Sequence, residues 1–73
     1  MRTEQESYDV ALNITRILLS DKKGDLTRAD ISEGVDRVVR HFGTEFKDER
    51  LRLRPFDTRA LCEDLAERFE VTT

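Results

Sequence analysis

Cysteine and proline are nearly missing from this sequence. Its 73 residues include one cysteine and one proline. The single cysteine, Cys62, excludes a disulfide framework within the chain. The single proline, Pro55, confines any strand that ends there to the edge of a sheet. A fold of this size without cross-links must draw on all of its helices for one apolar core, or a partner must complete that core.

Long apolar runs are missing as well. No stretch approaches the roughly 20 apolar residues that are needed to span a bilayer. The first nine residues lack the apolar run of a signal peptide and read MRTEQESYD. We therefore expect a cytoplasmic protein that makes no contact with a membrane.

Apolar residues make up 37% of the chain, which is below the average for a globular domain. A chain of this length forms one domain, here residues 1–73, and buries only about 60% of its unfolded surface. The shortfall slightly favours a dimer or a docked partner, and a free monomer is the equal alternative. The net charge of −3 argues against a dedicated nucleic-acid binder, because phosphate attraction supplies most nonspecific affinity.

The stretch 27–43 has the clearest pattern and predicts a helix over 28–42. Thr27 and Asp30 match a capping box, and Gly43 is expected to end the helix. Gly34 lies inside it, where a glycine either allows a close helix crossing or is simply tolerated on the surface. The apolar residues recur at the spacing of one helical face, against which the other segments should pack: Ile31, Val35, Val38, Val39 and Phe42.

A second helix is predicted over residues 4–20. Thr3 and Glu6 form a capping box at its start, and Gly24 can supply a left-handed stop after its end. Its apolar face is expected to be a wide stripe, since the helix has neighbours on two sides. The stripe consists of Val10, Ile14, Ile17 and Leu18, widened by Tyr8, Ala11, Leu12 and Leu19.

A third helix is predicted over residues 57–69. Asp57 is its expected N-cap, and Phe56 with Leu61 matches a hydrophobic staple. The buried face should be formed by Leu61, Leu65 and Phe69, with Cys62 beside it. The fold class is therefore mainly all-α, a small three-helix domain.

Residues 50–54 alternate arginine and leucine, which indicates a short extended or edge-strand segment. A lone strand is unstable in water, so it must pair with the tail 69–71, with the same segment of a second copy, or with a partner's sheet. The alternative is an extended loop whose leucines fill the core. Residues 44–48 are expected to form a helical turn with Phe46 directed inward.

No constellation of catalytic or metal-binding residues stands out. His41 is the only histidine, and Glu45 lies beyond the expected helix end at Gly43. The acidic neighbours of Cys62 would raise a thiol pKa rather than lower it. Residues 21–32 lack the glycine and the glutamate of a calcium loop. We therefore infer no enzyme activity and no cofactor, metal ion or small-molecule substrate.

The arginines are the most informative set. Residues 50–59 contain four arginines and one aspartate, whereas residues 60–73 contain four acidic residues and one arginine. This asymmetry suits a complementary protein surface or a second copy of the chain. We predict a non-enzymatic protein-interaction module or small adaptor that can self-associate, and the alternative is a dimeric DNA-binding transcriptional regulator. In either case the expected contact residues are Arg50, Leu51, Arg52, Leu53, Arg54 and Arg59.

Overall fold

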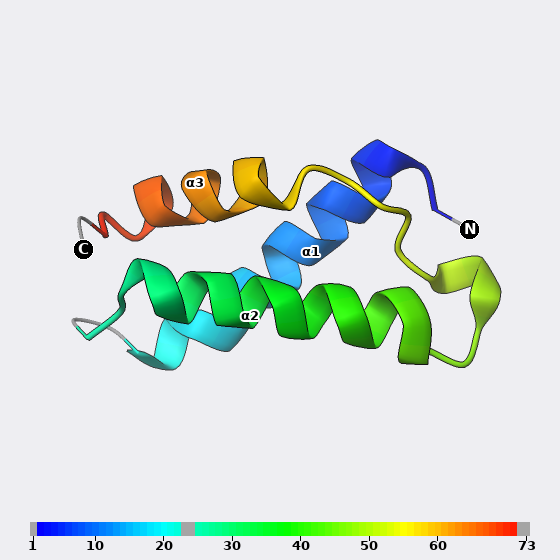
Figure 1. Ribbon diagram of the computed structural model, residues 1–73, viewed down its shortest axis with the longest axis horizontal. Helices are drawn as coiled ribbons and strands as arrows, with labels where there is room; N and C mark the ends of the chain where they lie inside the picture. Colours follow the sequence, from blue (N-terminus) through cyan, green and yellow to red (C-terminus); the bar gives the residue numbers. More distant parts are fainter. Residues whose placement is uncertain (1, 23–24, 72–73) are drawn as a thin grey trace.

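Three α-helices make up most of the computed structural model, which describes residues 2–22 and 25–71. They are α1 (Glu4–Leu19), α2 (Arg28–Arg40) and α3 (Thr58–Arg68). Figure 1 shows α2 and α3 side by side in opposite directions, with α1 running diagonally behind them. The predicted mainly α-helical class is confirmed, and each predicted helix is found within two residues of its expected bounds. The predicted stop at Gly24 lies outside the described residues.

The helix starts are set by local hydrogen bonds. The Thr3 hydroxyl accepts from the Glu6 N–H at 3.1 Å, and the Glu6 carboxylate accepts from the Thr3 N–H at 3.3 Å. Thr27 and Asp30 repeat this reciprocal box at the start of α2, and Asp57 caps α3 through the Ala60 N–H. All three predicted caps are present, because each depends only on residues three apart in sequence.

The core lies where the three helices meet. On α2, the side chains of Ile31, Val35 and Val38 are buried, as predicted. On α3, Leu61 and Leu65 are fully buried. Among the described residues, the buried apolar ones are Ala11, Leu19, Ile31, Val35, Val38, Leu53, Leu61, Leu65 and Ala66.

The predicted apolar face of α1 is wrong at Ile17 and Leu18, which were expected in the middle of the buried stripe. The buried residues of this helix are Ser7, Ala11, Thr15 and Leu19. Ile17 is 65% exposed and Leu18 is 45% exposed. The helix is therefore rotated so that Ser7, Ala11 and Thr15 face inward together with Leu19. Val10 and Ile14 are half-buried against the core, whereas Ile17 and Leu18 lie toward solvent.

A close crossing of α1 and α2 explains this rotation. A Cβ atom at Gly34 would lie 3.3 Å from Leu19 Cδ2 and 3.5 Å from Thr15 Cγ2. The missing Cβ of Gly34 thus lets α1 approach, and Thr15 offers a small side chain at the same place. The sequence left open whether Gly34 allows a close helix crossing or is simply tolerated on the surface, and the structure confirms the close crossing.

Replacing Thr15 by valine is expected to stabilise the fold. The Thr15 side chain is fully buried, and its hydroxyl oxygen has no hydrogen-bond partner among the described residues. An unpaired buried hydroxyl costs about 1–3 kcal/mol, whereas valine keeps the branched shape. We expect Thr15→Val to raise the free energy of unfolding in urea by about 1 kcal/mol. The matched change Thr44→Val should bring no gain, because the Thr44 hydroxyl donates to the Arg40 carbonyl at 2.8 Å.

The end of α2 differs from the prediction. Gly43 does not stop the helix, because a π-helical turn continues it over His41–Glu45. The turn is followed by Phe46, which is half-buried as expected. The Phe42 and Phe46 rings lie 5.2 Å apart between centroids. The helix expected to end at Gly43 is thus continued by a wider turn, and the Phe42–Phe46 contact follows that turn.

Residues 50–54 do not form the predicted edge strand. Glu49–Leu51 is a 3-10 turn, and extended backbone begins at Arg52. Leu53 is 5% exposed while Leu51 is 43% exposed, so the two leucines do not share one face. The Leu53 N–H donates to the Phe42 carbonyl at 2.9 Å. The segment is therefore an extended loop that places one leucine in the core, which was the alternative to a strand.

The chain turns sharply after α3. Glu70 has a φ of 55°, the left-handed conformation. The Val71 N–H donates to the Ala66 carbonyl at 2.8 Å, and the Glu70 N–H donates to the Glu67 carbonyl at 3.2 Å. These two bonds are those of a Schellman motif, in which glycine usually occupies the left-handed position.

Replacing Glu70 by glycine should therefore stabilise the protein. The left-handed conformation costs a residue with a Cβ roughly 1–2 kcal/mol, and glycine avoids this cost. We expect Glu70→Gly to raise the free energy of unfolding by about 1 kcal/mol in urea titrations. Glu67→Gly, inside the helix, should lower it by a similar amount. A loss of stability in both variants would show that Glu70 is not strained.

Candidate partner-binding surface

The four arginines among the six residues expected to contact a partner fall into two groups. Arg50 and Arg52 are held within the chain. The Arg50 guanidinium bonds to both carboxylate oxygens of Asp48 at 3.2 Å. The Arg52 Nε donates to the Phe46 carbonyl at 2.7 Å. These two arginines thus fix the loop between α2 and α3.

The second group consists of Arg54 and Arg59, whose side chains are exposed. Within residues 2–22 and 25–71, neither forms an ion pair or a side-chain hydrogen bond. Among the other arginines of the described residues, only Arg16 and Arg40 likewise form no ion pair and no side-chain hydrogen bond. Arg28 and Arg68, for example, pair with Glu63 and Asp64 of α3. A large part of the predicted charge asymmetry is thus neutralised inside the molecule.

Two of these unpaired arginines line one groove. It lies between the end of α2 and the extended chain leading to α3, and has a volume of about 450 Å³. Arg40 comes from α2 and Arg54 from the extended chain, and no acidic residue is found in the lining. We call it the arginine groove. Its apolar lining is formed by Val39, Gly43, Leu53, Pro55 and Phe56.

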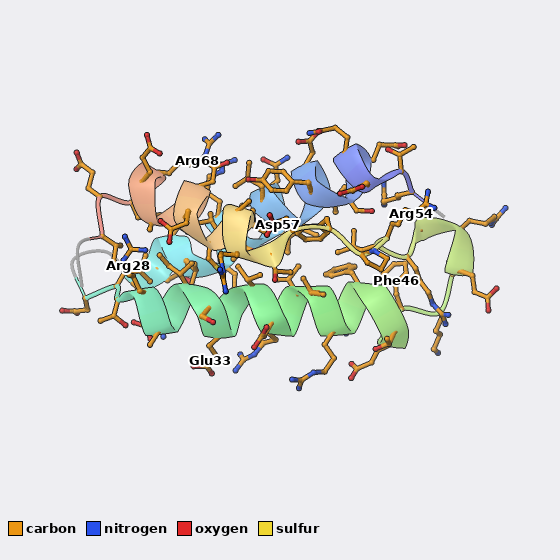
Figure 2. The ribbon with its side chains drawn as sticks, turned by 45° about the horizontal axis from the view of Figure 1, so that its top comes forward. Arg28, Glu33, Phe46, Arg54, Asp57 and Arg68 are labelled. Atoms are coloured by element: carbon orange, nitrogen blue, oxygen red, sulfur yellow. The ribbon has the colours of Figure 1, made fainter. Side chains whose placement is uncertain are left out.

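The wall of the arginine groove depends on one buried serine. Ser7 of α1 is fully buried, and its hydroxyl oxygen accepts the Arg54 N–H at 2.7 Å. On the preceding residue, the Leu53 N–H donates to the Phe42 carbonyl. Residues 53 and 54 are therefore attached to two different helices. Figure 2 shows Arg54 on this connection and Asp57 where α3 begins.

The Tyr8 side chain joins α1 to the far side of the groove. Its hydroxyl donates to Asp64 of α3 at 3.1 Å, and its ring meets Phe56 edge-on with centroids 5.8 Å apart. Burial raises the pKa of the Tyr8 phenol, and the hydrogen bond to Asp64 adds to this shift. The neutral phenol thus acts as a stable donor that positions α3 and Phe56.

The π-helical turn brings His41 and Glu45 together. The His41 Nδ1 lies 3.4 Å from a Glu45 carboxylate oxygen, although the sequence placed a helix break between them. The His41 ring also stacks edge-on against Phe42, with centroids 4.9 Å apart. Both polar side chains are exposed. This pair therefore belongs to the surface of the turn and not to an enclosed site.

Cys62 is half-buried on α3. Burial raises the pKa of its thiol, and the carboxylates of Asp36 and Glu63 add to the increase. Such surroundings disfavour the thiolate, as the sequence predicted. Across residues 2–22 and 25–71, no three His, Cys, Asp or Glu side chains gather in a way that could hold a metal ion. The helices in these ranges are too short or too polar to cross a membrane.

Sequence reasoning missed Arg40 and the apolar residues that form the groove with it. Arg40 is exposed at the end of α2. Its role at the groove arises only because residues 53–56 pass beside it. Comparison with protein-family models, with curated proteins and with solved structures finds no match to this chain.

Replacing Ser7 by alanine should loosen the groove wall. The change leaves the Arg54 N–H without its acceptor, and an unsatisfied donor of this kind costs about 1 kcal/mol or more. We expect a thermal midpoint about 4–8 °C lower for Ser7→Ala, measured by circular dichroism. Ser32→Ala, an exposed serine of α2, is the control and should leave the midpoint nearly unchanged. An equal midpoint in both variants would mean that Ser7 does not anchor the connection.

Proposed function

We propose that this chain is a non-enzymatic protein-interaction module of the cytoplasm, and that the arginine groove binds an acidic segment of a partner protein. The observation that supports it is the coincidence of two features. Arg40 and Arg54 are unpaired within the described residues, and the lining between them is apolar. The complementary occupant is a peptide segment with a bulky apolar side chain flanked by aspartate or glutamate.

Charge complementarity determines that the bound segment of the partner is negatively charged. The chain carries a net charge of −3, yet the charged residues that line the groove are both arginines. Five other arginines are neutralised by carboxylates of the same chain: Arg28, Arg37, Arg50, Arg52 and Arg68. Unpaired guanidinium groups can form bidentate hydrogen bonds with carboxylates supplied by a partner.

The apolar lining favours a protein partner over nucleic acid. Phosphate contacts require cations along the path of the backbone, and only two arginines line the groove. Val39 and Phe56 are half-buried and Leu53 forms part of the core, so the floor is rigid and apolar. A side chain such as leucine or phenylalanine gains free energy by leaving water at such a surface.

The test uses fluorescein-labelled synthetic peptides in which one Leu or Phe is flanked by Asp and Glu. We expect binding by fluorescence polarisation that weakens as NaCl rises from about 0.05 M to about 0.3 M, since screening reduces attraction between exposed charges. Arg40→Glu combined with Arg54→Glu should weaken binding about tenfold or more, because each exposed pair contributes up to about 1 kcal/mol.

One control variant and one blocking variant make this experiment specific. Arg16→Glu reverses the charge of an unpaired, exposed arginine outside the groove, and should change the affinity less than about twofold. Gly43→Leu adds bulk to the groove lining, where a Cβ atom would meet nothing within 4 Å, and should block the peptide without unfolding the chain. The proposal fails if no acidic peptide binds. It also fails if duplex DNA binds more tightly than every peptide, which would favour the DNA-binding alternative.

A further inference from the structure

Two large aliphatic side chains of α1 are left uncovered. Ile17 is 65% exposed and Leu18 is 45% exposed. Ile14 lies three residues before Ile17, on the same side of the helix, and is half-buried. The helix thus carries an apolar ridge that no described part of this chain covers.

A hollow lies directly beside this ridge, between α1 and the end of α2. It has a volume of about 420 Å³, and Leu18 forms one of its edges. Its apolar lining is continued by Ile14, Val38 and Phe42. We call it the α1–α2 hollow. A protruding ridge and a hollow of the same apolar character therefore share one patch of surface.

We infer that this patch binds a second copy of the same chain. In a two-fold symmetric contact each residue of one copy meets the same surface of the other. Such a contact requires a patch that is complementary to itself. Ile17 and Leu18 of each copy can enter the α1–α2 hollow of the other copy, so that one contact is formed twice.

The charges around the hollow favour the same occupant. Arg37, Arg40 and His41 line it together with Glu45, so both signs are present at one rim. Arg37 is paired with Glu33 inside the chain, and Glu45 lies beside the exposed His41, so Arg40 is the unpaired arginine of this rim among the described residues. A two-fold axis can place Arg40 of one copy near Glu45 of the other, and a mixed rim is therefore complementary to itself. The charged residues of the arginine groove are both arginines, so the groove lacks this property. Arg40 lines both surfaces, but the two linings call for different occupants, and the dimer does not depend on the proposed function.

The experiment is light scattering and sedimentation velocity of the full chain from about 1 µM to about 1 mM, a range that covers weak interfaces. We expect the apparent mass to rise from one copy toward two. Ile17→Glu combined with Leu18→Glu should keep the chain monomeric over the whole range, because it places charges in the apolar contact. Ile17→Ser alone, at the more exposed position, should weaken the dimer while leaving the helix content and thermal midpoint unchanged.

Leu51→Ser is the matched control, since Leu51 is 43% exposed and lies away from the lining of the hollow. It should leave the dimer intact. Each copy has a net charge of −3, so added NaCl screens their repulsion and should not dissociate the dimer, whereas it weakens binding of an acidic peptide. The inference is overturned by a wild-type chain that stays monomeric at about 1 mM. It is also overturned by a dimer that survives the double change or is lost equally on Leu51→Ser.

Discussion

The close contact of α1 with α2 at Gly34 is the constraint on which the rest of the molecule depends. Thr15 and Leu19 approach a backbone position that has no Cβ, so the two helix axes come near each other without a clash. This approach requires α1 to turn its small residues inward, and Ser7 and Ala11 are buried on the same side. The cost is one buried hydroxyl without a partner, on Thr15.

Two consequences follow from this orientation of α1. The first is that Ser7 reaches the surface over which the connection to α3 passes, and its hydroxyl holds the backbone of Arg54. The second is that Ile17 and Leu18 are left in solvent. One rotation thus shapes the wall of the arginine groove and exposes the ridge beside the α1–α2 hollow.

The arginines show how tertiary contacts sort residues of one type. Arg50 and Arg52 stand in the same alternating segment as Arg54, but local carboxylates and carbonyls bind them. Arg28 reaches across to Glu63 of α3, and Figure 2 shows it at the end of the molecule away from Arg54. The basic character that the sequence assigns to residues 50–59 is therefore concentrated, in the structure, at Arg54 and Arg59, with Arg40 added from another helix.

The amino-acid sequence by itself determined where the three helices begin and which side of α2 is buried. Those features depend on hydrogen bonds and spacings within about four residues, as at Thr3 and Asp57. Only the tertiary structure decided which side of α1 faces inward, how residues 50–56 run, and which arginines stay unpaired. These depend on what lies across the interface: Gly34 leaves room for Thr15 and Leu19 of α1, and Leu53 takes Phe42, not a strand, as its hydrogen-bond partner.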